Sequence, residues 1–339
     1  IFMRIGINPE KENNQLGLES YHRVVIPVYI PNLEEDYFKD GLVVFKLCVE
    51  SLLHTIHSKT RISLIDNGCC KVVKDYLKEL FGTQDRVDQL LNSKINLGKV
   101  NAIYSAVKSN LEPLITISDA DVMFLPNWQS NVEGILRDFP ESGMVSPVPS
   151  SLGYRSEFLN STMYYSVFKG KIRFEDVINP EGLVKFQESI GREMYTKVHL
   201  EKYLTVSNSK NSAAIGCGHF VATLRSDIFK SAPPEVCQHK IVGGSESTYF
   251  DIPNDEAGYL RLATKDNYAY HLGNVFEPWM KSKMEELLQH PKEEKVLEEL
   301  PNGKPMSSIQ FKIGKVLRIV LFKKFKKQYF RTKGIKIPY

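Results

Sequence analysis

Residues 114–121 read Leu-Ile-Thr-Ile-Ser-Asp-Ala-Asp, an apolar run that ends in two carboxylates one residue apart. A continuous apolar run of this kind is typical of a strand buried on both faces of a sheet. Two carboxylates at its end are costly beside apolar walls unless a cation or hydrogen-bond donors compensate them. Because Mg²⁺ and Mn²⁺ prefer carboxylate oxygens, Asp119 and Asp121 are candidate ligands of a divalent cation. The alternative is that Asp119 caps a turn and Asp121 is solvated.

Further strands of the same kind alternate with amphipathic helices on both sides of this run. Buried strands are expected at residues 23–29, 61–66, 113–118 and 143–148. Helices are expected at residues 40–58, 72–81 and 99–110. This alternation predicts an α/β fold with a doubly wound, mostly parallel sheet, because strand–helix–strand crossovers are right-handed. Ligands of such a sheet bind at the carboxyl ends of its strands.

The composition of the 339-residue chain narrows the class of protein. With 42% hydrophobic and 25% charged residues, the chain can bury a large core, which excludes a disordered or collagen-like protein. No run of 18 apolar residues and no signal-peptide pattern occurs, so a cytoplasmic location is expected. Five cysteines without a C-x-x-C pair predict reduced thiols rather than a disulfide framework or a zinc ribbon.

The net charge of +4 hides a strong asymmetry between the body and the C-terminal tail. Residues 300–339 carry eleven basic and no acidic side chains, which leaves residues 1–299 with a net charge of −7. The tail also places apolar residues on one helical face: Ile309, Ile313, Val316, Leu317 and Val320. A basic amphipathic helix suits an anionic membrane surface, on the inner face of the cell membrane for a cytoplasmic protein. The alternative is that the tail packs on the acidic body; nucleic-acid binding is not expected, because no recognition fold accompanies the basic run.

Several strand ends, taken in order, resemble the GT-A glycosyltransferases, and among them family 2. The resemblance covers about residues 23–274 and implies the Rossmann-like GT-A fold. It places Pro27, Val28 and Tyr29, at the end of the first strand, under the base and ribose of a donor nucleotide. It also implies that Asp66, after the second strand, accepts a hydrogen bond from uracil N3–H, so the expected donor is a UDP-sugar.

The metal-binding part of the family pattern lies in two further segments and one late histidine. Residues 96–101 resemble the loop and helix start that precede the family's metal motif, and residues 119–121 match that Asp-x-Asp motif. The resemblance implies that the donor diphosphate lies beside Asn96, Lys99, Asp119 and Ala120. It implies that Mn²⁺ or Mg²⁺ is held by Asp119, Asp121 and His271.

The sugar side and the general base are carried by later segments. Gly218 and His219 lie in a stretch that resembles the family's glycine-bearing segment near the sugar, where small residues let the backbone approach a ligand. The family commonly has a Glu-Asp pair about a dozen residues before a Gly-Tyr. The corresponding pair here is Glu246 followed by Ser247, so the second carboxylate is missing. Glu246 and Asp251 therefore remain equal candidates for the catalytic base.

The resemblance implies an inverting enzyme that moves a sugar from a nucleotide donor to a hydroxyl acceptor in cell-surface glycan synthesis, with a glycan or a lipid-linked acceptor. The chain has no Gln-x-x-Arg-Trp segment, which favours transfer of one sugar or a few rather than processive synthesis. One alternative is a non-catalytic nucleotide-sugar-binding scaffold on the same fold. Two others are a nucleotidyltransferase and a haloacid-dehalogenase-type phosphotransferase, although the latter requires Thr or Val where Met123 stands.

The expected domain organisation follows these patterns. Residues 1–21 form an N-terminal arm, and residues 22–277 form the glycosyltransferase domain. Within that domain, residues 22–149 make up the nucleotide-binding half and residues 150–277 the acceptor side. Residues 278–339 form a helical extension that ends in the basic tail.

Overall fold

The computed structural model describes residues 6–11, 15–241, 244–292 and 294–335. The strands among them are β1 (His22–Val28), β2 (Thr60–Asn67), β3 (Val87–Ser93), β4 (Leu114–Ser118), β5 (Val122–Phe124), β6 (Ser142–Ser146), β7 (Lys171–Asp176), β8 (Lys202–Ser207), β9 (Ser212–Ile215), β10 (Val221–Arg225), β11 (Leu260–Ala263) and β12 (Ala269–His271). The α-helices among them are α1 (Gly41–Thr55), α2 (Lys71–Thr83), α3 (Lys99–Val107), α4 (Trp128–Asp138), α5 (Asn160–Phe168), α6 (Pro180–Ser189), α7 (Lys197–Glu201), α8 (Ile252–Glu256), α9 (Pro278–Gln289), α10 (Ser308–Arg318) and α11 (Lys326–Thr332).

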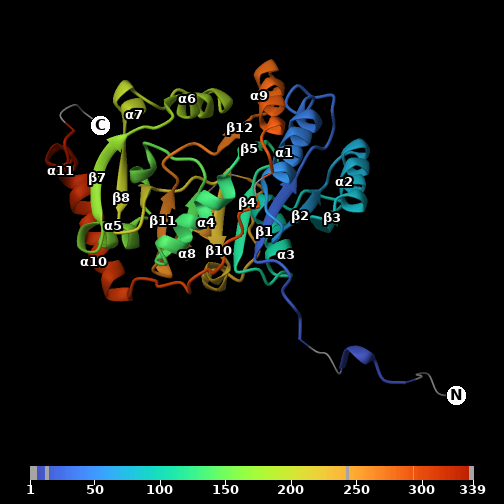
Figure 1. Cartoon of the computed structure of the whole chain (residues 1–339), viewed down its shortest axis with the longest axis horizontal. Coiled ribbons are helices and arrows are strands. Elements are labelled where there is room, and N and C mark those ends of the chain that lie inside the picture. Colours follow the sequence, from blue (N-terminus) through green and yellow to red (C-terminus); the bar gives the residue numbers. More distant parts are fainter. Residues whose placement is uncertain (1–5, 12–14, 242–243, 293, 336–339) are drawn as a thin grey trace.

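A single large sheet runs through the molecule in the order β3-β2-β1-β4-β10-β6-β11-β9-β8-β7, and β12 pairs with β5 in a second, two-stranded sheet (Figure 1). The strands β3, β2, β1, β4, β6, β11 and β8 run in one direction, and β10, β9 and β7 run in the other. The predicted α/β class with a mostly parallel central sheet is therefore confirmed.

Helices cover both faces of the β3-β2-β1-β4 part of the sheet. In β1, Val24 and Ile26 belong to a core cluster with apolar residues of α1 and α2. Val25, on the opposite face of the same strand, belongs to a cluster with residues of α3. Because successive side chains of a strand point to opposite faces, the unbroken apolar run of β1 is what allows helices to pack on both sides.

Two elements differ from the sequence prediction. The strand β3 was not expected, because it reads Val-Asp-Gln-Leu-Leu-Asn-Ser and lies half exposed at the edge of the sheet. The extension from residue 278 was expected to be helical, but its first helix, α9, ends at Gln289. Pro291 follows two residues later, and the residue before a proline is disfavoured in helical conformation. The poorly patterned residues 150–212 contribute β7 and β8, which extend the sheet at its far edge.

The basic tail packs against the body on one side and exposes apolar residues on the other. In Figure 1, α10 lies beside α5 at the end of the sheet that carries β7. A side chain at Gly314 would collide with the backbone of Asn160, so the glycine permits this close approach. The apolar residues Ile309, Ile313 and Val316 instead face outward, with exposed fractions of 72%, 41% and 60%. None of the helices in the described part of the chain is long and apolar enough to cross a membrane.

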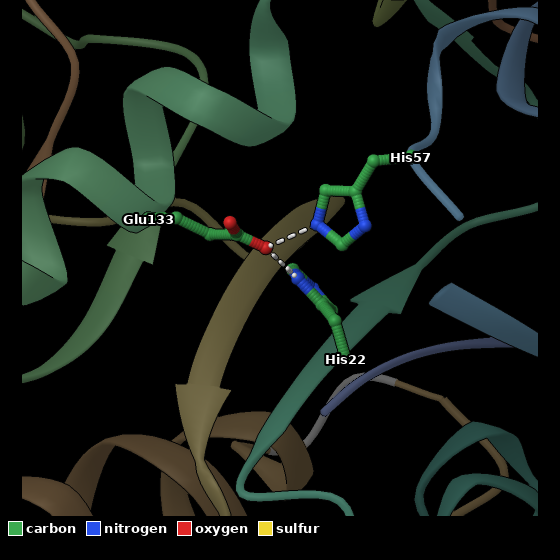
Figure 2. A group of neighbouring side chains, drawn as sticks. All are labelled: His22, His57 and Glu133. Atoms are coloured by element: carbon green, nitrogen blue, oxygen red, sulfur yellow. Dashed lines mark hydrogen bonds and ion pairs between the residues drawn. The ribbon is translucent and has the colours of Figure 1, made fainter. Parts of the chain in front are cut away.

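A buried polar cluster lies at the amino ends of the parallel strands, away from the edge where ligands are expected. Figure 2 shows the rings of His22 and His57 directed at one carboxylate oxygen of Glu133, at distances of 2.7 and 3.0 Å. The hydroxyl of Tyr21 donates to the other oxygen at 2.8 Å. Because the backbone N–H of Lys59 donates to Nδ1 of His57, the Nε2 atom of that ring carries the proton and donates to Glu133. The cluster thus joins β1, the α1–β2 turn and α4 by hydrogen bonds.

Candidate active site

The sequence-predicted site residues gather at the carboxyl edge of the parallel strands. Val28, the last residue of β1, pairs in register with Asp66 near the end of β2. Asp119 and Asp121 follow β4, which lies on the other side of β1. Since the carboxyl ends of parallel strands meet at one edge, the residues predicted for the donor nucleotide and the carboxylate pair share that edge.

Two neighbouring ladders fix the turn that carries the carboxylates. The backbone N–H of Asp119 donates to the carbonyl of Phe220 at 2.8 Å, because β10 runs antiparallel to β4 and begins at this edge. On the other side, β5 pairs with β12, and His271 stands opposite Val122. The sheet hydrogen bonds therefore bring Asp121 and His271 together, although 150 residues separate them.

The structure brings the side chains of Asp119, Asp121 and His271 close together. One ligand atom of each lies within 4.8 Å of the others, and Nε2 of His271 is 3.5 Å from Oδ2 of Asp121. The hydroxyl of Ser189 lies 2.9 Å from Nδ1 of His271 and thereby orients the ring toward Asp121.

The environment of Asp121 fits a cation at this point. Its Oδ1 atom is buried and has no hydrogen-bond partner among the described residues. Burial raises the pKa of Asp121 to about 6, although the facing His271 lowers it. An unpartnered buried carboxylate oxygen calls for a compensating charge, and two carboxylates with one imidazole are ligands that Mn²⁺ and Mg²⁺ accept.

Lys99 links the carboxylate pair to one of the two candidate bases. Its ammonium lies 2.5 Å from Oδ1 of Asp119 and 2.5 Å from Oε1 of Glu246. Burial lowers the pKa of Lys99, but the two carboxylates raise it more, so it lies above its usual range. Lys99 opens α3 directly after Gly98, whose φ of +83° and contact with the main chain of Lys240 leave no room for a side chain. The lysine is therefore a fixed positive charge at the site.

Asp251, the other candidate base, is enclosed by donors. Nε2 of His219 lies 2.8 Å from both of its oxygens, and the guanidinium of Arg261 lies 2.8 Å from Oδ1. Ser247 donates its hydroxyl to Oδ2 at 3.1 Å. Burial raises the pKa of Asp251, but Arg261 and His219 outweigh it and hold the pKa below its usual range. The side chain of Asp251 is only 2% exposed, against 27% for that of Glu246.

The residues predicted for the nucleotide have different surroundings. Tyr29 is 41% exposed just beyond β1, which leaves its ring accessible. Asp66 is buried, and its Oδ1 atom accepts the backbone N–H groups of Gly68 and Cys69. Its Oδ2 atom lies 3.8 Å from the ammonium of Lys74. Asp66 thus stabilises the turn after β2 with its Oδ1 atom, while its Oδ2 atom faces the ammonium of Lys74.

The remaining predicted residues lie in loops around the same edge. The side-chain oxygen of Asn96 accepts the amide of Asn67 and the backbone N–H of Gly98, and so holds the loop before α3. Pro27 and Ala120 are partly buried. Gly218 has open space where a side chain would lie, with Phe220 as its nearest neighbour at 4.0 Å. In this segment it is Gly216 that has to be a glycine, because its φ is +106° and a side chain there would collide with the backbone of Gly153.

Sequence reasoning missed two residues that hold the site together. Arg261 is buried within β11, where it also donates to Ser156 and to the carbonyl of Cys217. Its signal in the sequence is an arginine inside the apolar run Leu-Arg-Leu-Ala, since a buried arginine needs an acidic partner. Ser189 at the end of α6 has no such signal, because nothing near it in the sequence distinguishes it from other serines.

Comparison with known proteins gives similarity in fold only. No family model and no curated protein matches the chain. Among solved structures, it is similar to the mannosyltransferase PcManGT from Pyrobaculum calidifontis in complex with GDP-Man and Mn²⁺, with 12% identity, a TM-score of 0.47, and coverage of 95% of this chain and 78% of that one. It is also similar to residues 1–349 of S. aureus TarS, with 10% identity, a TM-score of 0.42, and coverage of 90% and 73%. The complex of TarS 1–349 with UDP-GlcNAc matches with 10% identity, a TM-score of 0.40, and coverage of 77% and 60%. The mannosyltransferase is of the class that the sequence resembles, and the activity of this chain has to be argued from its own site.

Proposed function

We propose that this chain is a metal-dependent glycosyltransferase that moves a sugar from a nucleotide donor to a hydroxyl acceptor. The observation that carries the proposal is the convergence of Asp119, Asp121 and His271 at the carboxyl edge of a doubly wound sheet, where Oδ1 of Asp121 is buried without a hydrogen-bond partner among the described residues. Asp119 also contacts Lys99, which adds a fixed positive charge. Such a set suits a diphosphate, which needs both a divalent cation and a basic side chain.

These residues account for departure of the nucleotide. Asp119, Asp121 and His271 would hold Mn²⁺ or Mg²⁺, which when bound neutralises the negative charge that develops on the diphosphate leaving group. Lys99 acts on the same charge by electrostatic attraction, from a position fixed by Glu246 and Asp119. Ser189 keeps the ring of His271 in its ligating orientation.

The donor nucleotide is proposed to lie over the ends of β1 and β2, with UDP as its diphosphate. The exposed ring of Tyr29 offers a surface for stacking the base, and Pro27 and Val28 directly precede it at the end of β1. Asp66 keeps its Oδ2 atom beyond the turn that it shapes, and this oxygen is the proposed acceptor for uracil N3–H. A guanine base presents N1–H and N2–H₂ as donors where uracil presents N3–H alone, so binding of UDP against GDP tests which base this position takes.

Transfer with inversion requires a group that takes the proton of the acceptor hydroxyl, opposite the leaving group. Glu246 and Asp251 are the two carboxylates that the sequence proposes for this role. Glu246 is paired with Lys99, and Asp251 is paired with His219 and Arg261. Neither carboxylate is an unpaired base, so the proton acceptor has to be assigned from the whole arrangement around them.

A test of the proposed function compares Asp121→Asn with the exposed Asp36→Asn, using released nucleoside diphosphate and Mn²⁺ binding as readouts. We expect the wild type and D36N to transfer sugar from UDP-linked donors in Mn²⁺. D121N should lose at least about 100-fold in rate, since charge stabilisation worth several kcal/mol is removed. A chelator should abolish transfer by the wild type. Binding of nucleotide sugar without turnover would instead support a non-catalytic sugar-nucleotide-binding protein.

The proposed acceptor is a glycan or a lipid-linked sugar at the inner face of a membrane, where one sugar or a few are added. The outward face of α10 supports this location. It exposes Ile309, Ile313 and Val316 beside the exposed lysines Lys312 and Lys315. Exposed apolar residues flanked by lysine match an anionic bilayer surface, at about 1 kcal/mol of attraction per basic residue near the surface.

Sedimentation with vesicles tests this location. The wild type should sediment with vesicles that contain phosphatidylglycerol, but not with pure phosphatidylcholine. Replacing Ile309, Ile313 and Val316 together by serine should release it. The matched control replaces Ile7, Leu16 and Leu18 of the exposed N-terminal arm by serine and should leave sedimentation unchanged. Equal sedimentation of both triple variants would count against a membrane-binding α10.

A further inference from the structure

We propose that His219, oriented by Asp251, is the general base that accepts the proton of the acceptor hydroxyl. This inference rests on the proposed glycosyl transfer and names its proton acceptor. It assigns the two residues different roles: His219 is the catalytic residue, and the buried Asp251 is a positioning residue.

The hydrogen bond between the two side chains fixes the proton on one ring nitrogen. Nε2 of His219 lies 2.8 Å from Oδ1 and 2.8 Å from Oδ2 of Asp251. Because Arg261 keeps Asp251 ionised, the carboxylate is an acceptor only, so Nε2 must carry the hydrogen. The lone pair of the neutral ring is then on Nδ1. This division of roles is that of a carboxylate–histidine pair in which the carboxylate selects the tautomer and the histidine takes the proton.

The side chain of His219 is partly exposed, and one of its ring nitrogens makes no hydrogen bond within the described residues. The side chain of His219 is 28% exposed, whereas that of Asp251 is 2% exposed. Within the described residues, His219 makes its side-chain hydrogen bonds through Nε2, and Nδ1 makes none. A ring that is held through Nε2 and keeps an unused lone pair on Nδ1 can accept a proton from a bound hydroxyl.

The pair lies beside the proposed metal ligands. His219 directly precedes Phe220, whose carbonyl accepts the backbone N–H of Asp119 at 2.8 Å. The ring of Phe220 lies 5.3 Å from that of His271, centroid to centroid. The backbone that leads into β10 therefore joins the proposed proton acceptor to the leaving-group side of the same site.

The carboxylates around His219 are already committed. The charged groups on the elements around it are Asp251 and Glu246 from residues 246–251, Arg261 from β11 and Asp119 from the turn after β4. Glu246 shares the ammonium of Lys99 with Asp119. Asp251 receives hydrogen bonds from His219 and Ser247 and forms an ion pair with Arg261. His219 alone among these groups combines an open lone pair with a neighbour that stabilises its protonated form.

The proposed step balances as follows. The O–H bond of the acceptor breaks, and its proton goes to Nδ1 of His219. The electron pair of that oxygen forms the new bond to C1 of the sugar. The bond from C1 to the diphosphate oxygen breaks, and its electron pair leaves with the nucleoside diphosphate. The imidazolium, stabilised by Asp251, then releases its proton to solvent.

The test compares His219→Gln with His290→Gln, an exposed histidine at the end of α9 that serves as the matched control. Glutamine retains an N–H donor for Asp251 but has no basic nitrogen, and because residue 219 is partly exposed the substitution should leave the fold intact. We expect H219Q to lose about 10²–10⁴-fold in kcat, the usual contribution of general-base catalysis. Binding of UDP and of Mn²⁺ should be unchanged in H219Q, and H290Q should match the wild type.

Two further readouts separate a base from a structural residue. The wild-type kcat/KM should fall at acid pH, where protonation removes the general base, and H219Q should lack this acid limb. Added imidazole should restore part of the rate of His219→Ala. If H219Q kept the wild-type rate and acid limb while Glu246→Gln lost them, the base would be Glu246 and the inference would be wrong. If the wild type transferred no sugar from any donor, the proposed function itself would fail.

Discussion

The ammonium of Lys99 lies between Asp119 and Glu246, 2.5 Å from a carboxylate oxygen of each. One cation thus ties the proposed metal-binding turn after β4 to the segment that begins at residue 246. Removing the ammonium of Lys99 should have two effects that removal of a solvent-exposed lysine would not have. The carboxylate of Asp119 would lose a neutralising partner, and a diphosphate at the site would lose a positive charge.

We therefore predict that Lys99→Met weakens binding of UDP by about 10–100-fold, since hydrogen bonds to charged groups contribute about 1.5–3 kcal/mol. Mn²⁺ binding in the absence of nucleotide should not weaken, because the ammonium competes with the metal for Asp119. Calorimetric titration of UDP and of Mn²⁺ measures both. Lys78→Met, on the exposed face of α2, is the control. Unchanged UDP affinity in K99M would exclude Lys99 from the donor site.

The contact between Ser189 and His271 gives a second prediction. Ser189→Ala removes the partner of Nδ1, and loss of such a partner typically lowers metal affinity by 10–100-fold, so we expect a decrease of about that size for Mn²⁺. Electron paramagnetic resonance of free Mn²⁺ during titration measures the change. Ser282→Ala on α9 should leave the affinity unaltered. An equal affinity in S189A would show that His271 is held by other contacts or is no ligand.

The buried cluster around Glu133 predicts how stability depends on pH. Burial raises the pKa of Glu133, but hydrogen bonds from His22 and His57 lower it more, to about 2. Since the ordinary value of 4.5 applies to the unfolded chain, the unfolded state takes up the proton first as the pH falls. The contribution of Glu133 is complete above about pH 4.5, declines toward pH 2, and amounts to about 3 kcal/mol.

Urea unfolding at a series of pH values checks this prediction. Between pH 5 and about pH 3, the free energy of unfolding should fall more steeply for the wild type than for Glu133→Gln. Burial lowers the pKa of His22, so protonation of this residue in the unfolded chain also favours unfolding as the pH falls below its ordinary value of 6.5. That contribution is expected in both proteins. Parallel slopes below pH 5 would show that Glu133 does not titrate in this way.

Packing of the tail gives a fourth prediction, with a control of the same chemistry. Gly314→Ala should lower the free energy of unfolding by about 1–3 kcal/mol, because the added methyl group meets the backbone of Asn160. Gly134→Ala lies within α4 with nothing within 4 Å of its added methyl group. It should instead raise the free energy by up to about 1 kcal/mol through helix propensity. Equal effects in the two variants would mean that α10 does not pack closely on α5.

The central strands were predictable because each is a continuous apolar run. Residues 23–29 and 113–118 were placed within a residue or two of β1 and β4, and the carboxylates at their ends followed from the same pattern. The edge strand β3 was not predicted, because it is only partly buried and its polar residues interrupt the apolar pattern that marks a strand. The sequence signal of a strand is therefore strong where the strand is buried on both faces and weak where the strand is partly exposed to solvent.

The tail shows a different failure of pattern reasoning. Apolar periodicity selected the face that carries Ile309, Ile313 and Val316, and this face is exposed. The buried face carries Gly314 and Arg318, which a hydropathy pattern counts as unfavourable. Gly314 is buried because it allows close backbone contact, and Arg318 is buried because it makes a hydrogen bond. A hydropathy pattern detects neither cause of burial. Arg261 escaped prediction for the same reason, because its acidic partner lies ten residues away in the sequence but was not identifiable from spacing.

The buried face of α10 also bears on how this protein can be re-engineered. Arg318 donates to the side-chain oxygen of Asn160 at 2.9 Å, and the amide of Asn160 donates to Asp255 at 2.7 Å, four residues after Asp251. A chimera that exchanged the last thirty or so residues for those of another protein would therefore leave Asn160 and Asp255 without a matched neighbour. The tail and the body therefore have to be exchanged together: a chimera that takes α10 from another protein also has to take the α5 that packs against it.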